Sequence, residues 1–215
     1  WSSDVCSSDL GAAQAQEIKE FNIGILGGEN AQDRLASNEC YRAAIETALG
    51  VPVKVFTPAD YDGVIQGLLG GTLDMAWLGA SAYAKVYLTD PAAVDLALTK
   101  QNIDGSTGYY SIGLARKDSG ITDIMSAKGK KLGYADPDST SGYLIPLTQI
   151  PTTTGEPNDK FFAETAFNGG HENNILAVID GKSDVAVDDS SGIGDFNDGF
   201  TSSTFHKMVA TRAAD

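Results

Sequence analysis

Segments of strand and helix character alternate along the chain from Phe21 onward, and this alternation restricts the fold more than any other feature. In the first half we expect strands at Phe21–Leu26, Val51–Phe56 and Leu73–Leu78, and helices at Asn38–Leu49, Asp60–Leu69 and Ala80–Leu88. In the second of these helices, Val64, Ile65 and Leu68 recur at the spacing of one buried helix face. Because strands joined by crossover helices pair in parallel, this half predicts an α/β lobe with a parallel sheet and helices on both faces.

The second half of the chain repeats the pattern. We expect strands at Tyr109–Arg116, Lys131–Ala135 and Asp184–Val187 and another strand within Phe161–Phe167, and helices at Ile121–Ala127, Ser139–Ile150 and Glu172–Asp180. Two α/β lobes built in the same way are therefore expected, over residues 16–108 and 109–215. No Pro- or Ser-rich linker separates them, so the junction near Gly105–Ser111 predicts a hinge. No strong strand follows Val187, and we expect the second lobe to be truncated before a return crossover.

The first fifteen residues predict processing rather than fold. Residues 1–10, WSSDVCSSDL, resemble the translation of a sequencing adapter, and we exclude them from the fold prediction. The A-x-A pattern at Ala13–Ala15 is typical of signal-peptidase cleavage and predicts an exported protein whose signal peptide is largely missing. With Cys6 inside the adapter-like stretch, Cys40 is left without a partner for an internal disulfide.

The formal net charge of −14 argues against nucleic acid or an anionic membrane surface as a partner. It does not exclude a small anion, because net charge acts at long range and is screened by salt. Backbone N–H groups and hydroxyls can still hold an anion locally. An anion site in this chain is therefore expected to rely on neutral donors rather than on lysines.

The stretch DPDSTSGYLIP, Asp136–Pro146, carries the clearest chemical pattern. A strand is followed by a turn, and the hydroxyl residues Ser139, Thr140 and Ser141 then open a helix. Hydroxyls and free backbone N–H groups at one helix N-terminus form a cradle for an oxyanion. The alternative is ordinary helix capping, with Asp138 or Ser139 as the N-cap residue.

A second pattern, NGGHENN, places His171 at a helix start directly after two glycines. A single histidine is more often structural, but in such a loop it is well placed to contact a ligand. The sequence HENNI is not the H-E-x-x-H pattern of zinc peptidases, and we expect neither a metal nor a cofactor.

Two tyrosines and two aspartates complete the candidate site. Tyr61 and Tyr109 flank polar or Gly-rich turns, where a ligand contact is as plausible as packing. Asp188 and Asp189 follow a strand; a solvated loop is the default interpretation, and a partner for a ligand ammonium group is the alternative.

Four motifs in order resemble the periplasmic phosphonate-binding proteins of ABC importers, a family that also includes phosphite and phosphate binders. They are ADYDGVIQGLLGGTLDMAWLGAS, DGSTGYYS, ADPDSTSGYLIP and FNGGHENNILAV, and the likeness extends from Phe21 to Gly199. The resemblance implies a class II periplasmic binding fold, in which two α/β lobes enclose a ligand cleft. It also implies a periplasmic, monomeric protein whose partners are a small phosphorus-containing anion and ABC permease subunits.

The resemblance further implies roles for individual residues. Those that match the family's ligands for phosphonate oxygens are Tyr61, Ser139, Thr140, Ser141 and His171. Tyr109 matches a tyrosine near the organic group of the ligand. Where family members place an acidic residue on a ligand amine, this chain has Ser191, so Asp188 or Asp189 is the expected substitute.

Two other classes of function compete with a binding protein. An enzyme acting on phosphate or phosphonate esters would need a nucleophile with a base, or metal ligands, and the sequence shows one histidine at the candidate site without clustered acids. An extracellular sensor domain of the same fold would differ only in what the rest of its gene encodes.

Overall fold

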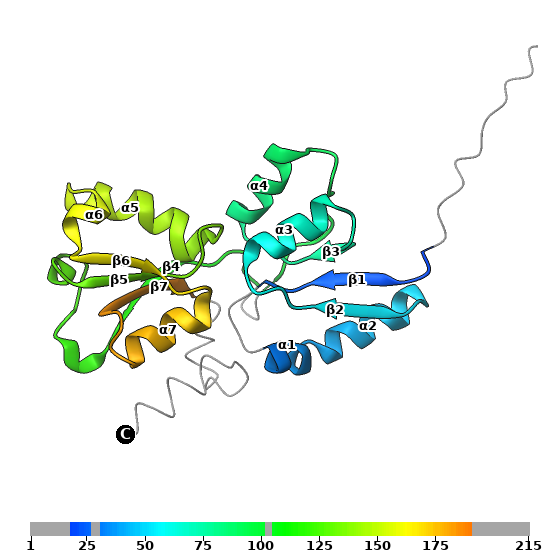
Figure 1. Ribbon diagram of the computed structural model, residues 1–215, viewed down its shortest axis with the longest axis horizontal. Helices are drawn as coiled ribbons and strands as arrows, with labels where there is room; N and C mark the ends of the chain where they lie inside the picture. The colour runs from blue at the N-terminus through cyan, green and yellow to red at the C-terminus, as the bar shows by residue number, and fades with distance from the viewer. Residues whose placement is uncertain (1–17, 27–30, 102–104, 191–215) are drawn as a thin grey trace, which may run out of the picture.

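The computed structural model describes residues 18–26, 31–101 and 105–190, which form two lobes lying side by side (Figure 1). The first lobe contains β1 (Phe21–Gly24), α1 (Ala31–Ser37), α2 (Glu39–Leu49), β2 (Val53–Phe56), α3 (Tyr61–Leu69), β3 (Met75–Ala76) and α4 (Ala80–Thr89). The second contains β4 (Ser111–Ala115), β5 (Lys131–Tyr134), α5 (Ile145–Thr154), α6 (Asn158–Phe161), β6 (Glu164–Phe167), α7 (His171–Ile179) and β7 (Val185–Asp189). The predictions made for the adapter-like stretch, for cleavage after Ala15 and for Ser191 lie outside the described residues.

The sheet of the first lobe is parallel, as predicted, with strand order β2-β1-β3. Alternation along β1 decides which helix each residue faces. A Cβ on Gly24 would meet Val64 of α3 at 3.1 Å, so the neighbouring Ile23, which is fully buried, faces the opposite side of the sheet. Helices therefore cover both faces, because crossover connections return along either side of a parallel sheet.

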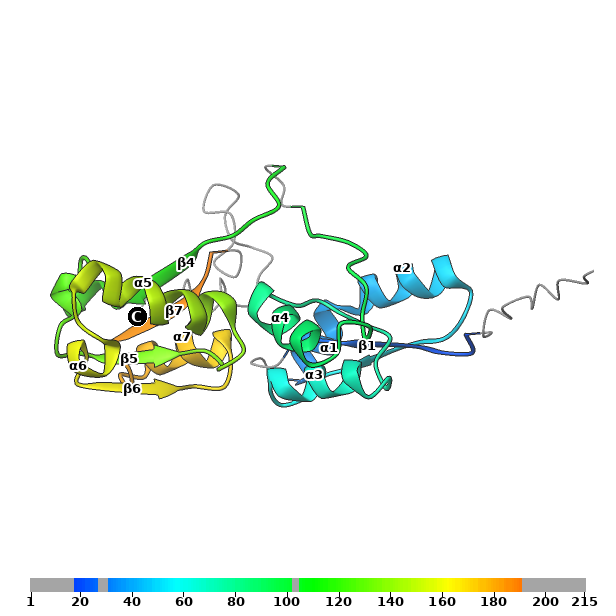
Figure 2. The ribbon, with the colours of Figure 1, turned by 90° about the horizontal axis from the view of Figure 1, so that it is seen from above.

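The sheet of the second lobe is mixed, with strand order β4-β7-β5-β6. β5 runs parallel to both β6 and β7, but β4 is antiparallel to β7, with Ser111 opposite Asp189. The prediction that both lobes are built alike is therefore wrong for β4. The reason is the direction of entry: the chain reaches β4 from the first lobe (Figure 2), so β4 begins at the edge where the parallel strands end.

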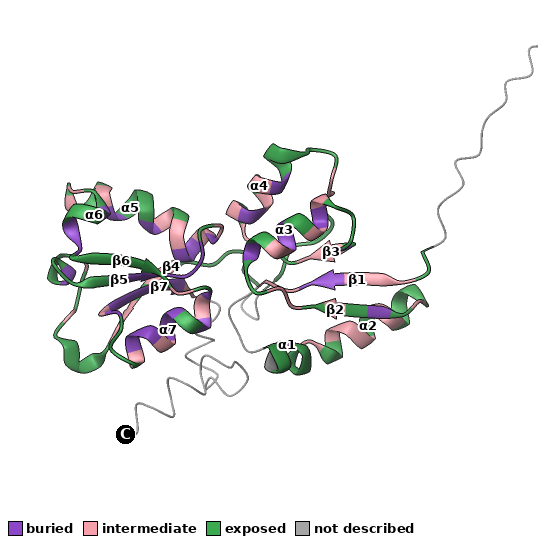
Figure 3. Cartoon of the chain, viewed as in Figure 1, coloured by how far each residue is buried: buried purple, intermediate pink, exposed green. Residues whose placement is uncertain are grey.

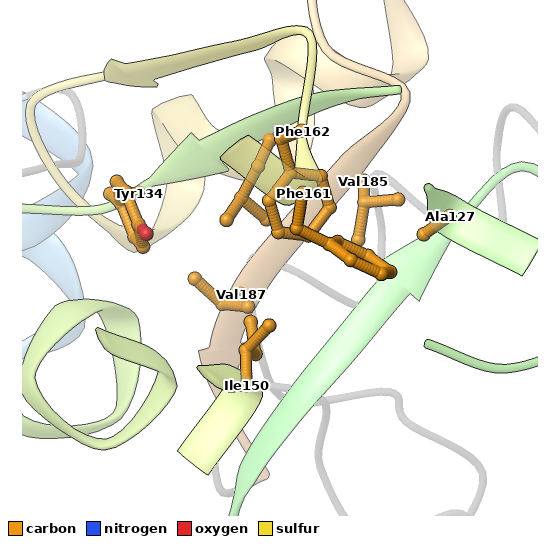
Figure 4. Packing of buried hydrophobic residues seen from close by; sticks show 8 residues of the cluster. Ala127, Tyr134, Ile150, Phe161, Phe162, Val185 and Val187 are labelled. Atoms are coloured by element: carbon orange, nitrogen blue, oxygen red, sulfur yellow. The ribbon is translucent and has the colours of Figure 1, made fainter. Parts of the chain in front are cut away.

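Each lobe has its own hydrophobic core. In the first lobe the buried cluster consists of Tyr61, Val64, Ile65, Leu68, Leu73, Ala82 and Val86. In the second it consists of Ala127, Leu132, Tyr134, Ile150, Phe161, Phe162, Val185 and Val187 (Figure 4). The two clusters share no residue, and the buried segments of Figure 3 follow the same division. The lobes therefore form separate packing units, as expected of two bodies joined at a hinge.

Two expected helices differ from the structure. The helix predicted at Ile121–Ala127 is reduced to a 3-10 turn at Met125–Ala127, whereas the strand expected within Phe161–Phe167 is confirmed as β6, which begins at Glu164. The helix predicted from Ser139 begins as a π-helical turn, Thr140–Leu144, and continues as α5 through Pro151 to Thr154.

The short helix α1 was not predicted, because it lacks an apolar stripe. It is attached instead by Arg34, which is buried and donates to the carbonyl oxygens of Leu26 (2.9 Å) and Pro58 (3.3 Å). Arg34 thereby ties together the loops that follow β1 and β2. Among the described helices, none has both the length and the apolar character required to cross a bilayer.

Asn174 of α7 is the central polar residue beneath the second sheet. Its side chain is fully buried, donates to the carbonyl oxygens of Gly133 (3.1 Å) and Val187 (2.8 Å), and accepts from Asn168 (2.7 Å). A Cβ on Gly133 would lie 2.3 Å from the Asn174 amide oxygen, so the strand needs glycine there. This side chain therefore fixes α7 to both β5 and β7.

We predict that Asn174→Ala lowers the free energy of unfolding by about 2 kcal/mol or more, because it leaves buried carbonyl and amide groups without partners. Chemical denaturation measures the change. Asn173→Ala on the same helix is the matched control, since Asn173 is exposed; a change within about 0.5 kcal/mol is expected there. Equal stability of the two variants would contradict the role assigned to Asn174.

Candidate functional site

The candidate residues gather where the two sheets present their carboxyl ends. In the second lobe, the loops that follow the parallel strands β5 and β6 lead to Ser139 and His171, and β7 ends at Asp189. The antiparallel β4 adds its first residue, Ser111, to the same edge. In the first lobe, Tyr61 begins the helix that follows β2. Ligands of open α/β sheets bind at this edge, because helix N-termini and loops converge there.

The two edges are in direct polar contact. Polar bonds cross from the first lobe to the second: Tyr61 N–H to Asp136 Oδ2 at 3.4 Å, Ser81 N–H to Thr140 Oγ1 at 2.8 Å, and Lys85 Nζ to Asp138 Oδ2 at 2.7 Å. Lys85 also binds Asp62 of its own lobe at 2.9 Å. These contacts hold the two lobes against each other around the candidate residues.

The hydroxyl turn has an unusual backbone. Ser139 caps it, accepting from the Gly142 N–H at 3.1 Å, so the capping interpretation is correct for this residue. The bond from Leu144 N–H to the Ser139 carbonyl, 3.1 Å, spans five residues, which widens the turn into π geometry. Such turns occur frequently at functional sites. The N–H groups of Thr140 and Ser141 open this turn, where a helix has no internal partners for them.

Close packing sets the position of the turn. A Cβ on Gly142 would lie 2.4 Å from the Ala135 Cβ and 3.1 Å from His171 Cε1, so only glycine allows the turn to approach the imidazole. Ser141 is buried, and its carbonyl accepts from the Ser111 hydroxyl at 2.7 Å. The turn is therefore held by both β4 and α7.

His171, the first residue of α7, connects the hydroxyl turn to β7. Its Nε2 lies 3.2 Å from Ser139 Oγ, and its Nδ1 is paired with Asp188 Oδ1 and lies 3.7 Å from Asp189 Oδ2. Burial alone would lower the pKa of His171, but Asp188, Asp189 and Asp136 together raise it above the usual value. The imidazole is therefore biased toward its protonated form.

Tyr61 of the first lobe approaches Ser139 and the aspartates around His171. Its side chain is buried and lies close to Ser139. Burial raises the pKa of the Tyr61 phenol, against the effect of Ser139, and the nearby Asp136 and Asp189 raise it further. The phenol is therefore neutral and keeps its hydrogen for donation.

Tyr109 lies at the rim of the site, with 41% of its surface exposed. Its hydroxyl would be 3.2 Å from a Cβ on Gly79, and Thr140 Oγ1 would be 2.8 Å from the same atom. Glycine before α4 thus lets Tyr109 and Thr140 approach the first lobe. The sequence-based interpretation did not identify Gly79.

The adjacent aspartates occupy different environments because side chains alternate along a strand. Asp188 is fully buried, and its Oδ1 is paired with His171 Nδ1 and accepts from the Asp189 N–H at 2.8 Å. Asp189 is partly exposed. Burial raises the pKa of Asp188, against the effect of His171. Of the two residues expected to meet a ligand ammonium group, only Asp189 lies near the surface.

His171, Asp188 and Asp189 also place one possible metal-ligand atom each within 4.8 Å of one another. In this arrangement the Nδ1 that would bind a cation is already paired with Asp188. The sequence-based interpretation missed Asp136, Ser81 and Lys85, which contact the candidate residues from positions distant in the sequence.

Comparison with known proteins identifies the family of the chain. Residues 23–213 match the family model described as the periplasmic phosphonate substrate-binding protein of an ABC transporter. The chain is 35% identical over 193 residues to the phosphonates-binding periplasmic protein of Escherichia coli, covering 87% of this chain and 56% of that protein. It is 30% identical to a phosphate-import protein of Mycolicibacterium smegmatis, covering 77% of this chain and 53% of that protein. The chain thus spans just over half the length of these relatives.

Solved structures show the same fold. A binding-protein component of a Pseudomonas aeruginosa ABC phosphonate transporter matches with a TM-score of 0.73 and 32% identity, over 81% of this chain and 58% of that one. A Prochlorococcus marinus protein, solved in complex with methylphosphonate, matches with a TM-score of 0.70 and 21% identity, over 80% of this chain and 64% of that one. The expected class II periplasmic binding fold is confirmed. The chain therefore belongs to the family of periplasmic phosphonate substrate-binding proteins of ABC transporters.

Proposed function

We propose that this protein captures a phosphonate, or a related phosphorus oxyanion such as phosphite or phosphate, in the cleft between its lobes and passes it unchanged to the permease of an ABC importer. It acts as a periplasmic monomer, without cofactor or nucleic acid. One observation carries the proposal: the two lobes meet at the hydroxyl turn, where the Tyr61 N–H of the first lobe donates to Asp136 and the Ser81 N–H donates to Thr140 of the second. An anion bound there contacts both lobes and stabilises the closed form.

The donors suit a tetrahedral anion. The hydroxyl turn offers side-chain O–H groups and backbone N–H groups, His171 offers Nε2–H, and Tyr61 offers its phenol. Each hydrogen bond to a charged oxygen contributes about 1.5–3 kcal/mol. Several such bonds reach the ~8 kcal/mol of a micromolar site, after the cost of ordering, without any lysine.

Ser139, His171 and Asp188 have the connectivity of a hydrolytic triad, serine to Nε2 and Nδ1 to aspartate. One feature favours binding over hydrolysis: the Ser139 Oγ already serves as the cap of the hydroxyl turn, where it accepts from the Gly142 N–H. The same connectivity serves a binding site by fixing the orientation of the donors.

We predict that Thr140→Val weakens phosphonate binding about tenfold to a hundredfold. Thr140 Oγ1 accepts from the Ser81 N–H, which leaves the hydroxyl hydrogen for an anion oxygen, and valine removes both bonds while keeping the shape. Isothermal titration calorimetry with methylphosphonate measures the effect. Thr152→Val, on the exposed side of α5, is the control and leaves affinity unchanged. If the Thr140→Val protein melts at a lower temperature but binds as tightly as the parent, the hydroxyl turn only caps the helix and does not bind the anion.

We also predict that Lys85→Gln weakens binding about twofold to fivefold, because it removes an ion pair between the lobes that favours closure. The value follows from the 0.2–1 kcal/mol typical of partly exposed pairs, and Lys85 is 40% exposed. The difference from the parent protein should shrink at high salt, because salt screens the pair. Lys128→Gln is the matched control: its partner Glu156 lies in the same lobe, so only stability can change. Equal effects of both variants on affinity would exclude a role in closure.

A further inference from the structure

His171 lies between the proposed anion-binding turn and a carboxylate that no ligand can reach directly. Its Nε2 points to Ser139 Oγ at 3.2 Å, while Nδ1 is paired with Asp188 Oδ1. Asp188 is fully buried, and its backbone is held within β7. A second bond, from the Asp189 N–H at 2.8 Å, fixes the carboxylate in place.

We propose that Asp188 is a positioning residue that keeps His171 protonated, with Nε2–H directed at the bound anion, and thereby supplies the positive charge of the site. This inference rests on the proposed function and adds how that site is regulated: the affinity for the anion depends on one buried proton.

The geometry gives the reason. An imidazole whose Nδ1 is paired with a carboxylate has a fixed orientation. The Nε2–H of His171 can therefore donate only toward Ser139. The residue before α7, Gly170, has a φ of 140°, a backbone conformation that favours glycine directly before His171. Asp188 thus acts on the ligand only through His171.

The charges around His171 explain why its proton matters for anion binding. The charged groups that face His171 are Asp188 and Asp189 of β7 and Asp136 after β5. Three carboxylates beside an anion site oppose binding unless a cation offsets them. The protonated imidazole is that cation, and the raised pKa of His171 agrees with this role.

The test is Asp188→Asn, which keeps the shape and an acceptor oxygen but removes the charge. The ¹⁵N chemical shifts of the imidazoles report protonation directly, and the chain contains only two histidines; the loss of one signal in His171→Gln assigns them. We expect the pKa of His171 in the ligand-free protein to fall by at least one unit in Asp188→Asn, and by less in Asp189→Asn, whose carboxylate is farther away at 3.7 Å.

Affinity for methylphosphonate is measured for the parent and for Asp188→Asn across the same pH range. The dissociation constant of the variant is divided by that of the parent at each pH. This ratio removes the effect of the ligand's own titration, which is the same for both proteins. Since a raised pKa keeps His171 charged to higher pH, the ratio should be near one or below in acid, rise as the pH passes the lowered pKa of the variant, and level off at least tenfold higher above the pKa of the parent. A purely structural role for Asp188 predicts a ratio that does not change with pH, and that result would overturn the proposal.

The parent protein alone provides a second test that does not depend on the folding of the variant. If its His171 titrates at or below the ordinary value of about 6.5, the proposal is wrong. If the parent binds no phosphorus oxyanion, the proposed function fails, and the titration of His171 still decides whether Asp188 holds the proton.

Discussion

The candidate site depends on the parallel pairing of β5 with β6 and β7. Because the three strands run in one direction, the segments that follow them meet at a single edge and bring together residues far apart in the sequence: the hydroxyl turn after β5, His171 after β6 and the aspartates at the end of β7. Asn174, bonded to both Gly133 and Val187, fixes α7 beneath that edge. The first lobe contributes Tyr61 and the start of α4 from the corresponding edge of its own parallel sheet.

A strongly acidic protein that binds an anion must solve its electrostatics locally. With a net charge of −14 the long-range field repels the ligand, and three aspartates lie close to the candidate donors. Screening in salt limits the first effect. The second is offset by neutral donors in fixed positions and by one imidazole paired with a buried carboxylate. Such an arrangement favours a ligand that accepts many hydrogen bonds over one that requires a large positive potential.

Strand and helix periodicity was sufficient to predict most elements, because strands such as β1 and helices such as α3 carry their packing pattern in their own residues. The hydroxyl turn and His171 were found in the same way, from helix-start patterns. The π geometry of the turn was not, because nothing in the local sequence marks the bond from the Leu144 N–H to the Ser139 carbonyl that widens it. Helix α1 was missed because a buried arginine, rather than an apolar face, attaches it.

Other features depend on distance in space rather than on neighbours in sequence. Lys85 and Asp138 are separated by 53 positions, and nothing in either local sequence indicates their pairing. Asp188 and Asp189 were equivalent candidates for a ligand amine until strand alternation buried the first against His171. In each case tertiary packing, rather than the local sequence, decides which partner a polar residue meets.

The central claim is that the two lobes close on a phosphorus oxyanion. Isothermal titration calorimetry of the protein with a panel of phosphonates, phosphite, phosphate and sulfate tests it most directly. The account predicts that at least one phosphorus oxyanion binds with one-to-one stoichiometry in the micromolar range or tighter and that sulfate binds more weakly. If none of the phosphorus compounds binds, or if sulfate binds as well as the best of them, the site described above is not a phosphorus-oxyanion site.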